Sequence, residues 1–197
     1  MAIKILGVGS SMREDSRGTL AVKIVLDFAR RYDAETRLLD LQQTKLPMYN
    51  PDSDESEEPQ VSKVEDDVNW ADAFILATPD YHGSMSGSMK NFLDHFWSEF
   101  AGKTFGYLCT SHEKGLTVMD QMRTAVRQCY GWSLSYGASI NPDEDFNSKG
   151  EITNARLSLR MEMLARDLAV YGQIIHDQFL RDLSSNESAT FAARYKK

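Results

Sequence analysis

Short apolar runs alternate with amphipathic segments along most of this chain, and this alternation limits its fold more than any other feature. The apolar runs have strand length and lie at residues 2–8, 35–41, 72–78, 103–110 and 132–140. Segments whose apolar residues recur at helical spacing lie between or after them, at residues 19–32, 60–70, 85–96, 116–130 and 157–168. Repeated strand–helix units predict a parallel sheet that carries helices on both faces.

The number and spacing of these units favour one sheet topology. Five strands within about 140 residues suit a flavodoxin-like α/β fold, a three-layer sandwich whose five-stranded parallel sheet has the order 2-1-3-4-5. The run 132–140 alternates large and small residues, so we expect a single edge strand there. Ligands of such sheets bind beyond the carboxyl ends of the strands, where the strand order reverses. The loops after strands one, three and four are therefore the candidate site.

Length and composition indicate one domain across residues 1–197. The segment "SKGE" at 148–151 could form a capping box for the last helix, and the polar tail 182–197 is expected to be loose. No apolar run approaches the roughly 20 residues of a membrane helix and no secretory signal is evident, so we expect a cytoplasmic protein. A net charge of −7 argues against general nucleic-acid binding, and the acidic stretch 51–59 is typical of a solvated loop.

The chain has two cysteines, Cys109 and Cys129, which are too few for a disulfide framework or a cysteine metal site. We interpret both as small buried hydrophobic residues. Cys109 ends the fourth strand near the candidate site, but a reactive thiol needs an electropositive setting that the sequence does not establish. No cluster of residues has metal-ligand spacing, so no metal site is predicted.

The loop after the first strand, "GVGSSMREDSRGTL", leads into a helix and contains Ser11, Arg13, Ser16 and Gly18. A helix N-terminus offers unpaired backbone N–H groups and a positive dipole end. Hydroxyl groups and one guanidinium add to these donors, and the combination suits a phosphate. The alternative is an ordinary strand-to-helix turn in which Ser16 caps the helix. The pattern is neither a P-loop nor the three-glycine dinucleotide fingerprint.

The loop after the third strand, "TPDYHGSMSGSMKN", covers residues 78–91 and is rich in small side chains. Pro79 fixes a turn at the strand end, and a glycine at position 83 lets backbone approach a ligand closely. Small residues from 84 to 88 leave the start of the next helix uncrowded, which favours a flat and large ligand. The alternative is that Gly87 merely lets two helices pack closely. Polar and aromatic groups at the rim come from Asp80, Tyr81 and His82.

Three segments resemble one protein family. "PDYHGSMSGSMKNFLD" is similar to the Pro-Glu-Tyr-Asn-Gly-Ser…Gly…Lys-Asn…Asp signature of the NADPH-dependent FMN reductases. "SMREDS" resembles the Ser-x-Arg-x-x-Ser phosphate loop of that family, and "LPMYNPD" resembles its Leu-Pro-x-Tyr-x-Pro-Asp segment. The resemblance covers roughly residues 2–175, and the two loop motifs are specific only in combination.

The resemblance implies a site for one FMN. Its phosphate would be held by Ser11, Arg13, Ser16 and the backbone near Gly18. The isoalloxazine ring and the ribityl chain would be lined by Pro79, Asp80, Tyr81, His82, Gly83 and Ser84. The loop 110–115, with Ser111 and His112, would meet the other edge of the ring. Members of the family usually pair as homodimers or homotetramers through their helices.

Three positions and one loop depart from the pattern of the family. Asp80 stands where Glu is usual, His82 where Asn is usual, and Gly18 where Asn is common. The loop 110–115 has His112 and two charged residues where many members are glycine-rich. FMN binding should survive these changes, because backbone groups make many of the contacts to the cofactor. Nicotinamide access is less secure, since the bulk of His112 narrows the space over the ring. His82 and His112 either contact the flavin or its acceptor, or lie exposed in loops.

The leading functional hypothesis is an FMN-dependent NAD(P)H oxidoreductase with ping-pong kinetics. NADPH or NADH would reduce the flavin, and a small-molecule acceptor, such as a flavin, quinone, azo or nitro compound or metal oxyanion, would then take its place. No side-chain acid or base is required, so no catalytic residue is predicted. One alternative is a flavodoxin-type electron-transfer protein without its own nicotinamide site, whose acidic surface would suit a basic partner. Another is a scaffold that has lost the flavin, against which the intact loop motifs argue.

Overall fold

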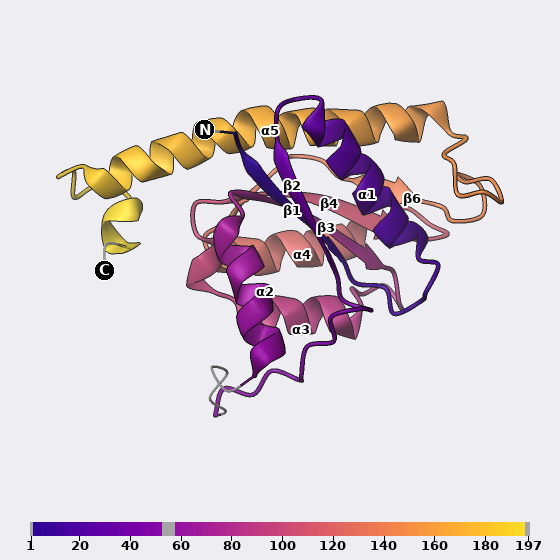
Figure 1. The fold of residues 1–197 in the computed structure, drawn as a ribbon, viewed down its shortest axis with the longest axis horizontal. Helices are drawn as coiled ribbons and strands as arrows, with labels where there is room; N and C mark the ends of the chain where they lie inside the picture. The colour runs from indigo at the N-terminus through magenta and orange to yellow at the C-terminus, as the bar shows by residue number, and fades with distance from the viewer. Residues whose placement is uncertain (1, 53–57, 196–197) are drawn as a thin grey trace.

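The computed structural model describes residues 2–52 and 58–195, which form a parallel sheet between two layers of helices (Figure 1). The strands are β1 Lys4–Gly9, β2 Glu35–Asp40, β3 Ala73–Pro79, β4 Thr104–Thr110, β5 Trp132–Ser133 and β6 Ala138–Ile140. The helices are α1 Arg17–Arg30, α2 Pro59–Trp70, α3 Gly87–His95, α4 Leu116–Gln128 and α5 Ala155–Ser184, with short 3₁₀ helices η2 Ser98–Phe100 and η3 Ala192–Tyr195. The predicted acidic loop 51–59 lies partly outside the described residues.

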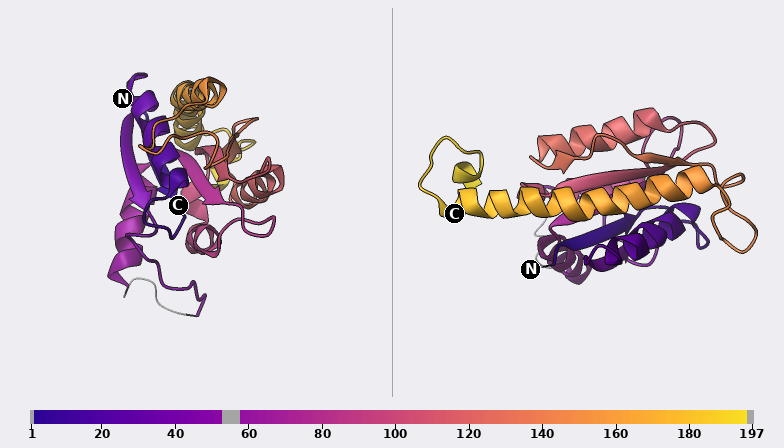
Figure 2. Two further views of the ribbon diagram at one scale, coloured as in Figure 1. Left: turned by 90° about the vertical axis from the view of Figure 1, so that its right-hand side faces the viewer. Right: turned by 90° about the horizontal axis from the view of Figure 1, so that it is seen from above.

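The strand order is β2-β1-β3-β4-β5, and every pairing is parallel, so the predicted flavodoxin-like topology is confirmed. Helices α1 and α5 cover one face, and α2, α3 and α4 cover the other (Figure 2). Strand β3 serves both layers, because Ile75 belongs to the core under α1 and α5 while Phe74 and Leu76 belong to the opposite core. A strand buried on both faces reads as a continuous apolar run, as residues 72–78 do.

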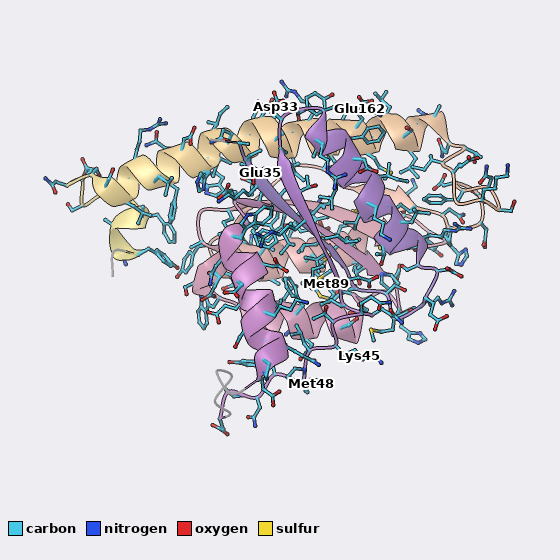
Figure 3. All side chains as sticks on the ribbon, in the orientation of Figure 1. Asp33, Glu35, Lys45, Met48, Met89 and Glu162 are labelled. Atoms are coloured by element: carbon cyan, nitrogen blue, oxygen red, sulfur yellow. The ribbon has the colours of Figure 1, made fainter. Side chains whose placement is uncertain are left out.

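Side-chain burial follows these layers. Met89 on α3 has no exposed surface and lies in the interior, whereas Met48, on the loop before α2, is 81% exposed at the outer edge (Figure 3). On the other side of the sheet, a Cβ at Gly7 would lie 2.3 Å from the Cγ1 atom of Val22. Only glycine therefore lets α1 approach β1 this closely, and this approach fixes the start of α1 at the carboxyl edge of the sheet.

The edge strand differs from the prediction for 132–140. Two short strands, β5 and β6, form there instead of one, and both pair with β4. Between them the chain leaves the sheet, and the Tyr136 hydroxyl donates to the Asp167 carboxylate on α5 at 2.7 Å. A tertiary hydrogen bond to a distant helix has outweighed the period-two pattern on which the prediction was based.

The last helix also begins later than predicted. Its N-cap is Asn154, whose Oδ1 accepts from the amides of Arg156 and Leu157, so the predicted capping box at 148–151 is wrong. Asn147 organises that segment as a turn, because its Oδ1 accepts from the amides of Lys149 and Glu151. At its other end, α5 runs to Ser184 and so includes the first residues of the segment 182–197.

The described part of the tail returns to the body of the protein. The ring of Phe191 lies 4.6 Å from the ring of Tyr130, between centroids, and Ala192 is 1% exposed. Figure 1 shows this segment folding back beside the end of α5, at the opposite end of the molecule from the start of α1. Among residues 2–52 and 58–195, no helix combines the length and apolar character needed to span a membrane.

Candidate functional site

A cavity of about 240 Å³ opens at the carboxyl edge of the sheet, where the loops after β1, β3 and β4 meet. It lies at the point where the strand order reverses, which is where ligands of such sheets bind. Nine of the twelve predicted site residues line it: Ser11, Arg13, Ser16, Gly18, Pro79, Asp80, Tyr81, Ser111 and His112. Four further lining residues were not predicted: Asp15, Arg17, Thr110 and Pro142.

The N-terminus of α1 forms one wall of the cavity. Ser16 is its N-cap, and its Oγ accepts from the amide of Thr19 at 3.1 Å. Within the described chain, the amides of Arg17 and Gly18 have no backbone or side-chain acceptor. A Cβ at Gly18 would lie 2.9 Å from Thr110 Oγ1, so a side chain there would close the space in front of these amides. Free amides at a helix N-terminus, with room before them, fit a phosphate.

Two arginines line the cavity, and their surroundings differ. The Arg17 guanidinium donates to the carbonyl of Asn147 at 3.5 Å and lies 5.5 Å from the ring centroid of Phe146. It therefore holds the loop between β6 and α5 against α1. The Arg13 guanidinium is exposed and makes no hydrogen bond or ion pair with any residue that the structure describes. Arg13 is thus the cation that remains free to pair with an anion.

Asp80 connects the loops after β3 and β4. Its Oδ1 accepts from the amide of Gly83 at 2.8 Å, and its Oδ2 accepts from the Ser111 hydroxyl at 3.0 Å. Its own amide donates to the carbonyl of Thr110 at 2.8 Å. A carboxylate at this position therefore fixes the two loops to each other, and the shorter side chain of Asp, in place of the usual Glu, has a structural role here.

The residues after Asp80 form a tight turn. Tyr81 and Ser84 exchange two backbone hydrogen bonds of 2.9 and 3.1 Å, and His82 and Gly83 between them both have positive φ. This is the backbone of a two-residue hairpin, and a histidine in its first position is unusual. The turn leaves Tyr81 46% exposed at the rim of the cavity. His82, Gly83 and Ser84 do not line the cavity, so three predicted residues lie beside the site and not within its walls.

Gln121 on α4 holds this turn from outside. Its Oε1 accepts from the Ser84 hydroxyl at 2.9 Å and from the amide of Met85 at 3.3 Å. Its Nε2 donates to the carbonyl of Gly83 at 3.1 Å. Sequence reasoning missed Gln121, because a polar residue on an amphipathic helix carries no signal of a contact 37 residues away along the chain.

The small residues after the turn are linked by hydroxyl groups. Ser86 is the N-cap of α3, and its Oγ lies 2.8 Å from that of Ser10 and 3.2 Å from that of Thr78. Ser88 donates to the carbonyl of Ser10. This buried network joins the loop after β1 to the start of α3. A Cβ at Gly87 would meet no atom within 4 Å, so close helix packing does not explain Gly87.

His112 stands at the mouth of the cavity. Its Nδ1 lies 3.6 Å from the Asp143 carboxylate, and both side chains are largely exposed. The pair connects the loop after β4 with the loop after β6, beside Pro142. His112 is thus one of the predicted residues that line the cavity.

Cys109 lies behind the site and is fully buried. Burial, with a smaller contribution from the charge of Asp80, raises the pKa of its thiol to about 12. The thiol is therefore protonated at neutral pH, and its full burial agrees with its interpretation as a small hydrophobic residue. Within the part of the chain that the structure describes, no group of three His, Cys, Asp or Glu side chains is placed to hold a metal ion.

Fold and cavity together define a flavodoxin-like α/β protein whose ligand cavity lies at the switch point of its sheet. The sequence model of the NADPH-dependent FMN reductase family matches residues 3–142, and the chain belongs to this family. The predicted class, an FMN-dependent NAD(P)H oxidoreductase, is thereby confirmed.

Two relatives have similar sequences over most of their length. An NADPH azoreductase from Bacillus sp. (strain OY1-2) is 29% identical over 131 residues, which cover 65% of this chain and 71% of that protein. An NAD(P)H-dependent FAD/FMN reductase from Geobacillus thermodenitrificans is 23% identical over 168 residues, covering 83% and 90%.

Solved structures share the fold at lower identity. FerB, a flavoenzyme NAD(P)H:(acceptor) oxidoreductase from Paracoccus denitrificans, superposes with a TM-score of 0.71 at 17% identity, over 88% of this chain and 98% of that one. A WrbA-like flavodoxin from Agrobacterium tumefaciens gives 0.62 at 16% identity, over 88% and 99%. These likenesses support the flavodoxin-like architecture.

Proposed function

We propose that this protein binds FMN in the cavity at the carboxyl edge and uses it to transfer electrons from NADPH or NADH to a small-molecule acceptor. The observation that carries the proposal is the free Arg13 guanidinium beside the unpaired amides at the start of α1. Ser11, Arg13, Ser16 and the backbone of Gly18 would hold the phosphate. Bound FMN would supply hydride acceptance and electron transfer, which no side chain of this site provides.

The remaining walls of the cavity would hold and orient the ring. Pro79 and Tyr81 offer flat apolar surface at the rim. Asp80 and Ser111 fix the two loops that flank this surface, so its width is set before any ligand binds. His112 lines the cavity, with Asp143 3.6 Å away, and would narrow the space over a bound ring. Reductant and acceptor would use the same opening in turn, and this predicts ping-pong kinetics.

The acceptor is proposed from the relatives. An azoreductase and a flavin reductase are among them, so we expect this chain to reduce azo compounds or free flavins. A homodimer or homotetramer in the cytoplasm is part of the proposal. Sedimentation velocity of the purified protein tests the oligomeric state.

An FMN titration of the purified protein and two variants tests the site. Arg13→Ala should weaken FMN binding roughly tenfold or more, because a charge-assisted phosphate contact is lost. Riboflavin, which lacks the phosphate, should bind both proteins equally. Arg31→Ala removes an arginine at the far end of α1 and should leave both affinities unchanged. If Arg13→Ala weakened riboflavin and FMN alike, the phosphate assignment would be wrong.

A second candidate function is a flavodoxin-type electron carrier, which the net charge of −7 favours through docking to a basic partner. The two functions differ in one measurement. Steady NADPH or NADH oxidation by the FMN-loaded protein with an azo dye, and without any reductase, supports the enzyme. FMN binding without such turnover supports the carrier.

A further inference from the structure

A second cavity, of about 530 Å³, lies at the amino edge of the sheet, opposite the proposed FMN site. Its walls come from the α4–β5 connection, the end of α5 and the returning tail. Trp132 fixes its place, because it pairs with Thr104 at the first position of β4. Figure 1 shows the end of α5 and the tail at the opposite end of the molecule from the start of α1. The two cavities share no lining residue.

The walls of this second cavity are mainly aromatic and aliphatic. Tyr130, Trp132 and Ile174 are 48%, 59% and 57% exposed, and Phe191 is 39% exposed. Isolated exposed apolar side chains are ordinary, but several that line one concave space indicate a binding site. The volume lies within the range of about 300–1,000 Å³ that is usual for small-molecule sites.

Ring contacts hold these walls in place. The Tyr130 and Phe191 rings pack with their centroids 4.6 Å apart, and Tyr195 packs against both. The Phe179 ring lies directly over Gly102, where a Cβ would come within 2.4 Å of it. The cavity is therefore built before any ligand arrives. Aromatic walls favour planar aromatic ligands, because rings pack against rings in offset or edge-to-face contacts.

The lining of the second cavity carries one cation, Arg127 on α4, and one carboxylate, Asp182 on α5. The Arg127 guanidinium, in the last turn of α4, forms no hydrogen bond, ion pair or ring contact with residues 2–52 or 58–195. Asp182, the acidic residue of the lining, keeps its negative charge on the α5 side, where it accepts from the neutral Gln178 Nε2 at 2.6 Å. A ligand therefore meets an unpaired cation on the α4 side of a mainly apolar space.

We propose that this second cavity is a binding site for a planar aromatic anion, such as an aromatic carboxylate, separate from the FMN site. The rings of the ligand pack among Tyr130, Trp132 and Phe191, and its acid group pairs with Arg127. The site goes beyond the proposed function, since it requires neither flavin nor nicotinamide.

Calorimetric titration with 2-naphthoate tests this proposal, using protein saturated with FMN so that the cofactor cavity is filled. Ile174→Trp places a large side chain in the cavity and should weaken naphthoate binding at least tenfold. Leu159→Trp is the matched control, because Leu159 is 60% exposed on the same helix but lies outside the cavity. Leu159→Trp should leave the affinity for naphthoate within a factor of about two of the parent value. Both variants should melt and bind FMN as the parent protein does.

The anion preference is tested by Arg127→Gln. This change should weaken naphthoate binding only roughly three- to tenfold, since Arg127 is exposed and water screens its charge. Binding of neutral 2-naphthylmethanol should be unchanged. Arg156→Gln, an equal change of charge outside the cavity, should affect neither ligand.

Three results would overturn the proposal. They are no naphthoate binding to the FMN-saturated protein, equal effects of Ile174→Trp and Leu159→Trp, or no effect of Arg127→Gln. In the first case, a changed oligomeric state of Ile174→Trp would show that a second copy of the chain covers this surface. None of them bears on FMN binding, so this proposal and the proposed function fail independently.

Discussion

At the scale of single residues, Asp80 is the side chain on which the shape of the proposed FMN site most depends. It accepts hydrogen bonds from Gly83 on its own loop and from Ser111 on the next. Asp80→Ala should lower the free energy of unfolding by about 1–2 kcal/mol and weaken FMN binding several-fold, because both loops lose an acceptor. Asp80→Asn keeps one acceptor and can donate to Ser111, so it should retain most of the stability and most of the FMN affinity. Urea unfolding and FMN titration of the two variants check this, and equal losses in both would contradict it.

The sequence predicted most of the residues that line the cavity but not the different roles that they have there. Arg13 and Arg17 are four positions apart and look equivalent in the sequence. Only the fold brings Arg17 to Asn147, 130 residues away, and leaves Arg13 free. In the same way, His82 stands at a position of the loop motif where the family usually has Asn, but it lies in the hairpin turn with positive φ and does not line the cavity. Motif spacing shows which loops meet, whereas the backbone conformation decides which side chains face inward.

At the scale of helices and strands, prediction succeeded where one element could be judged by itself. β3 and β4 are long apolar runs, and both formed as expected, as did α1. Ser16 caps α1, as the alternative interpretation of its loop predicted. The errors fall where a distant element decides the outcome. The hydrogen bond from Tyr136 to Asp167 splits the edge strand, and Asn154, not the capping box, begins α5. Local patterns carry no information about such contacts.

The contact between α4 and the turn after β3 gives a prediction at this scale. Gln121→Ala removes three hydrogen bonds to Gly83, Ser84 and Met85, all of them at the surface or half-buried. The turn should therefore loosen while the sheet stays intact. We expect faster amide exchange at residues 81–85, a severalfold weaker FMN affinity and a free energy of unfolding within about 1 kcal/mol of the parent. Gln128→Ala, on the same helix but away from the turn, is the control. Unchanged exchange at 81–85 would show that Gln121 does not hold the turn.

At the scale of the whole molecule, Lys103 makes the stability of the protein depend on pH. It lies at the amino edge of the sheet, where its Nζ donates to the carbonyl of Val68 at 2.7 Å. Burial lowers its pKa from 10.5 to about 8, against the opposing charges of Asp72 and Glu99. The unfolded chain therefore binds more protons than the folded one between these values, and this residue's contribution to the free energy of unfolding rises with pH across that window.

Lys103→Met isolates this contribution. The difference in free energy of unfolding, parent minus variant, should increase by at most about 3 kcal/mol between pH 8 and 10.5. Urea unfolding of both proteins across this range measures it, and tyrosines that titrate in the same range cancel in the difference. A difference that stayed flat or fell with pH would contradict the prediction.

The two cavities at opposite edges of one sheet lead to a prediction for thermal stability. A ligand that binds only the folded state at 100 times its Kd adds about 2.7 kcal/mol, or roughly 5–10 °C in Tm for a chain of this size. The cavities proposed for FMN and for 2-naphthoate share no lining residue, so the two contributions to stability should add when both ligands are present. Arg13→Ala should reduce the FMN increment alone, and Ile174→Trp the naphthoate increment alone. Thermal melts with each ligand and with both measure these increments. If 2-naphthoate alone raised Tm but the combined increment were no larger than the FMN increment, both molecules would compete for one site, because a second occupied site must raise Tm further.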